Sequence, residues 1–149
     1  MNARFLQPGH LVISVEPMTI TTILGSCVAV CIWDYRKRVG GMNHFMLPIF
    51  SGGSATSSPR FGDVAMHQLI EGLRAIGAKL PFMRARVFGG ACMFEQMQSA
   101  THLGNKNVEV ALDFLAANGV EVIQIDAGGS RGRKVLYETE GGTACLTSI

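Results

Sequence analysis

The order of apolar and polar residues along the chain predicts eight short β-strands and two longer amphipathic helices. The predicted strands cover residues 11–15, 20–24, 27–33, 39–47, 82–88, 121–126, 134–139 and 143–149. The strands at 27–33 and 39–47 are apolar on both faces, which is typical of strands that other layers cover on both sides. The residues before position 11 show no such pattern and are expected to lack regular structure.

The two helices are predicted from apolar residues at helical spacing. In residues 63–76 such residues recur every three or four positions, and Gly77 supplies a C-terminal stop. Asn105 or Asn107 is expected to cap a second helix that runs to about Ala117.

The order of these elements predicts an α/β layered sandwich with a mixed, largely antiparallel sheet and two main helices. The chain shows no internal repeat and no domain boundary, so residues 1–149 are expected to form a single domain. With 149 residues, of which 48% are hydrophobic, it is long enough for one packed core and too apolar for a disordered chain.

The charge pattern narrows the choice of partners. The net charge is only +2, and the longest basic cluster, Arg36-Lys37-Arg38, lies in a predicted turn, where we interpret it as a solvated loop tip. No basic block has the extent of a nucleic-acid footprint, so no nucleic-acid binding is expected.

The compartment is predicted from three absences in the sequence. No apolar stretch reaches the length of a membrane span, and the first residues lack the apolar region of a signal peptide. The four cysteines do not have the density of a disulfide framework. We therefore expect a cytoplasmic protein with free thiols and no membrane insertion.

Two residues in the central strands carry chemistry that packing does not require. Cys27 follows the turn Gly25-Ser26, and His44 ends a glycine-rich stretch of the next strand. If a turn of residues 34–37 joins the two strands, Cys27 lies opposite His44 and the two side chains share a face. A slip of one residue would place them on opposite faces.

A thiol beside an imidazole can act as a nucleophile with its general base. The Gly25-Ser26 turn leaves the backbone N–H groups of Ser26 and Cys27 available to an oxyanion. A third group usually orients the imidazole, and Thr21 and Thr22 on the preceding strand offer hydroxyls and carbonyls for this role.

Simpler interpretations of the same residues remain open. Cys27 can be a buried structural cysteine beside a core histidine. A zinc pair of Cys27 and Cys31 is conceivable, but neither Cys92 nor Cys145 has a second ligand at zinc spacing, so no metal and no cofactor are expected. Cys31, Cys92 and Cys145 are expected to pack as small apolar side chains.

Several motifs together resemble the CheD family of chemoreceptor glutamine deamidases. Leu24-Gly25-Ser26-Cys27-Val28-Ala29-Val30 and Gly41-Met42-Asn43-His44-Phe45-Met46-Leu47-Pro48 carry the most specific part of the likeness. The likeness continues in Phe88-Gly89-Gly90-Ala91-Cys92-Met93-Phe94, in Gly104-Asn105-Lys106-Asn107 and in residues 126–134.

The resemblance implies a Cys-His-Thr site on an α/β sandwich. In the family's pattern Cys27 matches the nucleophile, His44 the base and Thr21 the third member. Such a site hydrolyses selected glutamine side chains through a cysteine thioester and releases ammonia. Some relatives also act as receptor methylesterases.

The resemblance also implies partners. The substrates would be methyl-accepting chemotaxis receptors, at whose signalling domains the protein would act, and a CheC-type phosphatase would bind in species that have one. Gly128, Gly129, Arg131 and Arg133 are candidate contacts for a receptor or partner, or else part of a solvated connection.

Two rival functions remain. One is a non-catalytic adaptor that binds chemoreceptors or the CheC phosphatase. The other is a thiol hydrolase that acts on an unrelated amide or ester.

Overall fold

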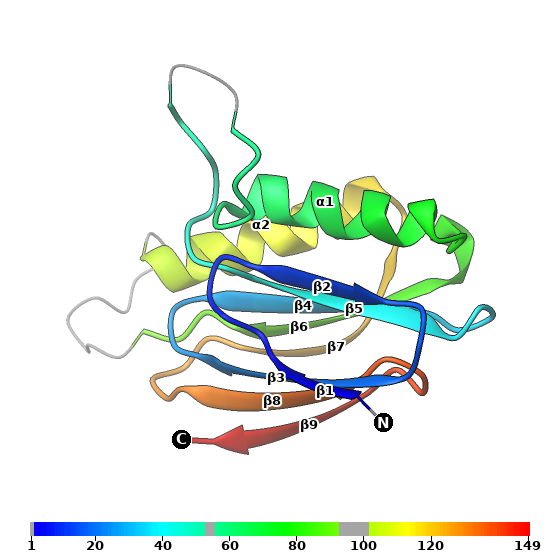
Figure 1. The fold of residues 1–149 in the computed structure, drawn as a ribbon. Helices are drawn as coiled ribbons and strands as arrows, with labels where there is room; N and C mark the ends of the chain where they lie inside the picture. The colour runs from blue at the N-terminus through cyan, green and yellow to red at the C-terminus, as the bar shows by residue number, and fades with distance from the viewer. Residues whose placement is uncertain (1, 53–55, 93–101) are drawn as a thin grey trace.

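The protein is built in three layers, with two helices above a five-stranded sheet and a four-stranded sheet below it (Figure 1). The computed structural model describes residues 2–52, 56–92 and 102–149. Met93 and Phe94, which belong to one of the motifs above, lie outside the described residues. The α/β layered sandwich with two main helices predicted from the sequence is confirmed, but its strands divide into two sheets, each of them mixed.

The five-stranded sheet has the order β2-β5-β4-β6-β7. Its strands are β2 (Leu11–Ser14), β5 (Val39–Phe45), β4 (Val28–Asp34), β6 (Met83–Gly89) and β7 (Glu121–Ala127). All neighbours run antiparallel except β6 and β7, which are parallel. β4 is the middle strand, and both β4 and β5 are largely or wholly buried, as their two-sided apolar pattern predicts.

The four-stranded sheet has the order β1-β3-β8-β9. Its strands are β1 (Asn2–Phe5), β3 (Met18–Leu24), β8 (Arg133–Glu138) and β9 (Thr143–Ser148). The expectation that the N-terminus lacks regular structure is wrong, because β1 pairs in parallel with β3. All four β1 residues are exposed, so the strand has no buried face that could produce an apolar pattern.

The helices are α1 (Gly62–Ala75) and α2 (Leu103–Ala117), and a short 3₁₀ turn, η1 (Leu80–Phe82), precedes β6. The predicted cap of α2 is wrong. The helix begins earlier, and its N-cap is His102, whose ring accepts a hydrogen bond from the Asn105 N–H at 3.3 Å. Neither helix is long and apolar enough to cross a membrane.

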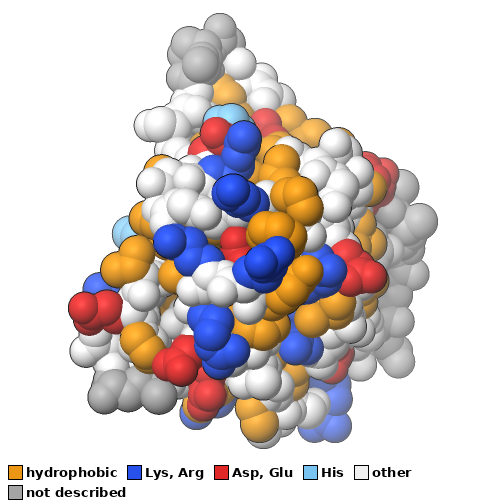
Figure 2. All heavy atoms as spheres, turned by 90° about the vertical axis from the view of Figure 1, so that its right-hand side faces the viewer, with side chains coloured by type: hydrophobic (Ala, Val, Ile, Leu, Met, Phe, Trp, Pro, Cys, Tyr) orange, Lys and Arg blue, Asp and Glu red, His pale blue; other side chains and the backbone are white. Residues whose placement is uncertain are grey.

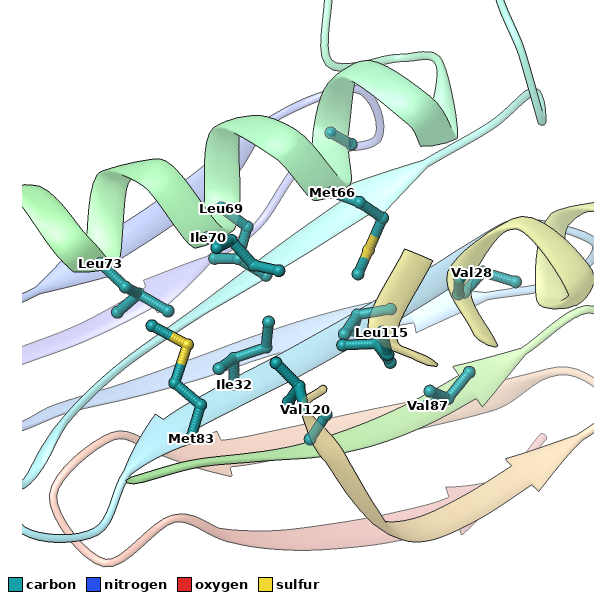
Figure 3. Close-up of a cluster of buried hydrophobic side chains, with 14 of the residues drawn as sticks. Val28, Ile32, Met66, Leu69, Ile70, Leu73, Met83, Val87, Leu115 and Val120 are labelled. Carbon is teal, nitrogen blue, oxygen red and sulfur yellow. The ribbon is translucent and has the colours of Figure 1, made fainter. Parts of the chain in front are cut away.

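Alternate residues of β4 serve two different cores. Val28, Val30 and Ile32 face the helices, where α1 contributes Leu69 and Leu73 (Figure 3). The intervening Ala29 and Cys31 face the second sheet and pack with the side chains of its strands. The site lies on this second face, between the sheets.

The turn between β4 and β5 differs from the predicted one. Asp34 pairs with Val39, so the turn consists of residues 35–38 instead of 34–37, and the register is displaced by two residues. The Asp34 carboxylate causes this, because it accepts the N–H groups of Arg36 and Lys37 at 2.9 Å each and closes the turn after itself. Since the displacement is even, every side chain keeps its predicted face.

Lys and Arg side chains, with Asp and Glu among them, are spread over the end of the molecule that carries this turn (Figure 2). Arg36, Lys37 and Arg38 are exposed, as predicted, and Arg36 stacks over the ring of Phe82 at 4.7 Å. Cys27 lies at the other end of β4, roughly 20 Å away at the usual rise of a strand.

Gly41 of β5 is expected to tolerate no side chain. A Cβ there would lie 2.6 Å from the Val12 carbonyl oxygen and 3.0 Å from Leu69 Cδ1. Gly41→Ala should lower the free energy of unfolding by about 1–3 kcal/mol in urea titrations. Gly25→Ala is the control, because a Cβ at Gly25 meets no atom within 4 Å. Equal stability of the two variants would contradict this packing argument.

Candidate active site

His44 lies near the end of β5 on the face between the two sheets. It is paired with Ala29 of β4, and its backbone is tied to the preceding loop, because its N–H donates to the His10 carbonyl at 3.1 Å and its carbonyl accepts from the Gly9 N–H at 2.8 Å. Only 1% of the residue is exposed. The ring is therefore held by the backbone and removed from bulk water.

Cys27 immediately precedes β4 and is half-buried. By the observed register it lies diagonally across from His44 instead of directly opposite. The two residues still share a face, and Cys27 packs against the core between the sheets. The sequence thus predicted the shared face correctly and the direct pairing wrongly.

The threonine beside His44 is Thr22, not Thr21. The Thr22 Oγ1 lies 2.7 Å from His44 Nδ1, and the residue is fully buried. Side chains alternate along β3, and Thr22 shares the inward face with the buried Ile20 and Leu24, whereas Thr21 is only half-buried. The pleat of the strand thus brings Thr22, and not Thr21, into contact with His44.

The contacts of Thr22 determine which nitrogen of His44 carries the proton. The hydroxyl also lies 2.8 Å from the Leu6 carbonyl oxygen, which can only accept. A hydroxyl has one proton, so both short contacts are hydrogen bonds only if Thr22 donates to Leu6 and accepts from His44 Nδ1. This assigns the proton to Nδ1 and leaves the Nε2 lone pair available as a base.

Burial keeps both reactive groups neutral. Desolvation lowers the pKa of His44 to about 4, so the imidazole carries no charge at neutral pH. Desolvation raises the pKa of the Cys27 thiol, and a hydrogen bond from its own backbone N–H opposes this in part. In the part of the chain that is described, His44 Nε2 has no hydrogen-bond partner, so the two groups do not form an ion pair.

The segment after β6 supports the turn that carries Cys27. The Gly90 N–H donates to the Cys27 carbonyl at 2.9 Å, and the Ala91 N–H donates to the Gly25 carbonyl at 3.0 Å. Gly89 has a φ of 111°, and a Cβ there would collide with the Cys27 carbonyl oxygen. A glycine is required at this point for the close approach of the two backbones.

The loop of residues 128–132 lies next to this segment. The Gly128 N–H donates to the Gly89 carbonyl, and the Cys92 N–H donates to the Gly129 carbonyl, each at 2.9 Å. Between this loop and the end of β9 is a hollow of about 400 Å³. Gly128 and Gly129, the two predicted contact glycines, are thus linked to Cys27 through the segment after β6.

The two arginines of this region differ. Arg131 is exposed at the hollow. Arg133 pairs with the Asp126 carboxylate at 2.9 Å and donates to the Gly128 carbonyl at 2.8 Å, with only 12% of its side chain exposed. Arg133 therefore holds the loop, and Arg131 is the better placed of the two to meet a partner.

Asn107 of α2 lies at the site, although the sequence predicted it only as a possible helix cap. It is fully buried, and its Nδ2 donates to the carbonyls of Ser26 and Met46 at 3.1 Å each. Helical spacing carries a signal for this burial, because Asn107 lies on one stripe with Gly104, Ala111 and Leu115.

The other cysteines lie apart from this chemistry. Cys31 and Cys92 are buried, as predicted, and burial raises the pKa of the Cys31 thiol. Cys145 is exposed on β9, so the prediction that it packs as an apolar side chain is wrong. Among the described residues no group of three or more His, Cys, Asp or Glu side chains is arranged to hold a metal ion.

Comparison with known proteins identifies the family. The model of the family described as CheD chemotactic sensory transduction matches residues 46–148. The chain belongs to the CheD family. The "Probable chemoreceptor glutamine deamidase CheD" of Trichlorobacter lovleyi is 43% identical over 95% of this chain and 88% of that protein. The "Probable chemoreceptor glutamine deamidase CheD 1" of Anaeromyxobacter dehalogenans is 43% identical over 97% of this chain and 84% of that protein.

Among solved structures, this CheD-family chain is similar to the Bacillus licheniformis hypothetical protein YfiH. The TM-score is 0.49 and the identity 12%, over 77% of this chain and 51% of that one. The Cys27 and His44 positions precede the span that the family model matches, but the CheD relatives align with nearly the whole chain.

The buried neutral His44 should make the stability of this CheD-family protein depend on pH. An unfolded histidine binds a proton below about 6.5, whereas folded His44 does so only near 4. The free energy of unfolding should therefore fall as the pH decreases through this window, by up to about 1.4 kcal/mol per pH unit from this residue. Urea titrations between these pH values measure the slope.

The matched variants separate His44 from the other titrating groups. His44→Gln should flatten the slope relative to the parent, and His67→Gln, at an exposed position of α1, should leave it unchanged. A parental slope in His44→Gln would mean that His44 is not held neutral by burial.

Proposed function

We infer that this CheD-family protein is a protein-glutamine deamidase that acts on chemotaxis receptors. The relatives named above carry that activity in their names. The observation that carries the proposal is the His44 Nε2 lone pair, which has no partner among the described residues and lies on the face that Cys27 shares. A histidine that served packing alone would be expected to have both ring nitrogens paired.

The proposed reaction begins with the neutral pair. His44 Nε2 takes the proton of the Cys27 thiol as the sulfur attacks the side-chain amide carbon of glutamine, which forms a tetrahedral intermediate. Because burial disfavours both charged forms at rest, the proton moves during the attack instead of before it. Catalysis therefore does not need a preformed thiolate.

The second half of the reaction releases the products. The carbon–nitrogen bond breaks, Nε2–H gives its proton to the departing nitrogen, and ammonia leaves a thioester on Cys27. His44 Nε2 then removes a proton from water as the water oxygen attacks the thioester carbon. The carbon–sulfur bond breaks, and Nε2–H returns the proton to the sulfur, which releases glutamate and restores the thiol. The backbone N–H groups of Ser26 and Cys27 are the proposed donors to the oxyanion in both steps.

Thr22 takes the place that the family resemblance gives to Thr21. By accepting from Nδ1 it stabilises the tautomer in which Nε2 is the base, and it also compensates the partial positive charge that the ring acquires. The Thr22 hydroxyl keeps its own proton and donates it in a hydrogen bond to the Leu6 carbonyl throughout.

The proposed receptor surface surrounds Cys27 and extends to the loop of residues 128–132. Gly128, Gly129 and Arg131 are the proposed contacts, with Arg131 suited to an acidic position on a receptor helix at the signalling domain. Arg133 supports this loop instead of contacting the partner. A CheC-type phosphatase, in an organism that has one, would compete with the receptor for the same surface.

Cys27→Ala tests the nucleophile. The variant should release no measurable ammonia from a glutamine-containing receptor fragment, and the fragment should not show the mass change of an amide converted into a carboxylate. Cys145→Ala, an exposed cysteine on β9, should retain the parental rate. A Cys27→Ala variant that deamidates at the parental rate would refute the mechanism, and tight binding without deamidation by the parent would favour an adaptor.

Thr22→Val and Thr21→Val test which threonine acts on His44. Valine keeps the shape of threonine but cannot accept from Nδ1, so Thr22→Val should lower kcat by about ten- to hundredfold. Thr21→Val should change kcat by no more than about twofold. Steady-state ammonia release measures both, and a larger loss in Thr21→Val would return the third role to Thr21.

A further inference from the structure

Asn107 links the two catalytic strands from a distant part of the chain. Its Nδ2 group donates to the Ser26 carbonyl, 81 residues away in sequence, and to the Met46 carbonyl, 61 residues away. Ser26 directly precedes Cys27, and Met46 is the first residue after β5, which ends in Phe45. One side chain thus holds the backbone on both sides of the proposed chemistry.

The Asn107 amide bonds to the two strands just beyond the last backbone pair between them. The last pair of the β4–β5 ladder is Val28 with Phe45. Beyond it a side-chain amide replaces the next backbone pair, because its two N–H groups can serve two carbonyls at once. The turn that carries Cys27 is thereby kept at a defined separation from the strand that carries His44.

The orientation of the amide leaves a polar atom unpaired. Since both backbone carbonyls can only accept, the nitrogen of Asn107 must face them and Oδ1 must face away. That oxygen is buried and has no partner among the described residues. An unpaired buried acceptor is unfavourable, and an apolar residue at this position would avoid that cost. The contribution of Asn107 is therefore the pair of hydrogen bonds that its Nδ2 donates.

We propose that Asn107 is a positioning residue, which fixes the geometry between Cys27 and His44 without touching the substrate. This rests on the roles proposed above for those two residues. Nucleophilic attack is sensitive to displacements of about 1 Å, and the amide removes this freedom where the strands separate. Asn118, the C-cap at the other end of α2, donates a local hydrogen bond from its side chain to the Phe114 carbonyl at 2.9 Å.

Asn107→Asp is the sharpest test, because it preserves shape and replaces the donor by an acceptor that faces two carbonyls. The variant should lose about ten- to hundredfold in kcat while KM for the receptor fragment changes by no more than about twofold. Alkylation of Cys27 by iodoacetamide should slow by about tenfold, since the base is displaced from the thiol. Asn107→Ala, which adds no repulsion, should show the same split in milder form.

Two control variants separate positioning from loss of stability. Asn118→Asp should retain parental kcat and alkylation rate. Leu115→Ala, in the helix–sheet core of α2, should lower the melting temperature and leave kcat unchanged in assays well below that temperature.

The inference is overturned if Asn107→Ala keeps parental kcat and Cys27 alkylation, or if Leu115→Ala loses kcat to the same extent at equal stability. Failure of the proposed function is distinguishable from this. If the parent protein does not deamidate receptor fragments, the function fails, while the alkylation rates still report whether Asn107 positions Cys27.

Discussion

The two-sided burial of β4 is the constraint on which the rest of the structure depends. Its alternate residues belong to two cores, with Val28, Val30 and Ile32 under the helices and Ala29 and Cys31 against the second sheet. A shift by one residue would exchange the two sets and place small residues where large ones pack. The side chain that continues the second set at the start of β4 is Cys27, so the fold itself directs the thiol between the sheets.

The interior position of the site explains its charge state. Between two sheets an imidazolium would lose its hydration, and the Thr22 hydroxyl that contacts His44 already donates a hydrogen bond to the Leu6 carbonyl. The ring is therefore neutral and its tautomer is defined. The resting site therefore holds no ion pair between His44 and Cys27, and the free lone pair on His44 Nε2 is the one that the proposed proton transfer requires.

Sequence could predict the parts of this arrangement that depend on local pattern. The strands around Cys27 and His44 follow from their apolar runs, and the shared face survived a register displacement by two residues because side-chain period in a strand is two. The contact of His44 with Thr22, and not with Thr21, could also have been predicted, since Ile20 and Leu24 mark the inward face of β3. β1 could not be predicted in this way, because its four residues are exposed and the strand is defined by its pairing with β3.

The role of Asn107 shows what pattern alone cannot supply. Helical spacing places it among buried positions, yet nothing local says that its partners are the carbonyls of Ser26 and Met46. Those carbonyls are available because the backbone pairing of β4 with β5 ends at Val28 and Phe45. The backbone pairing that holds His44 thus ends before Cys27, and a third element has to supply the hydrogen bonds beyond the last pair. In this fold α2 does so with a side chain that offers two donors.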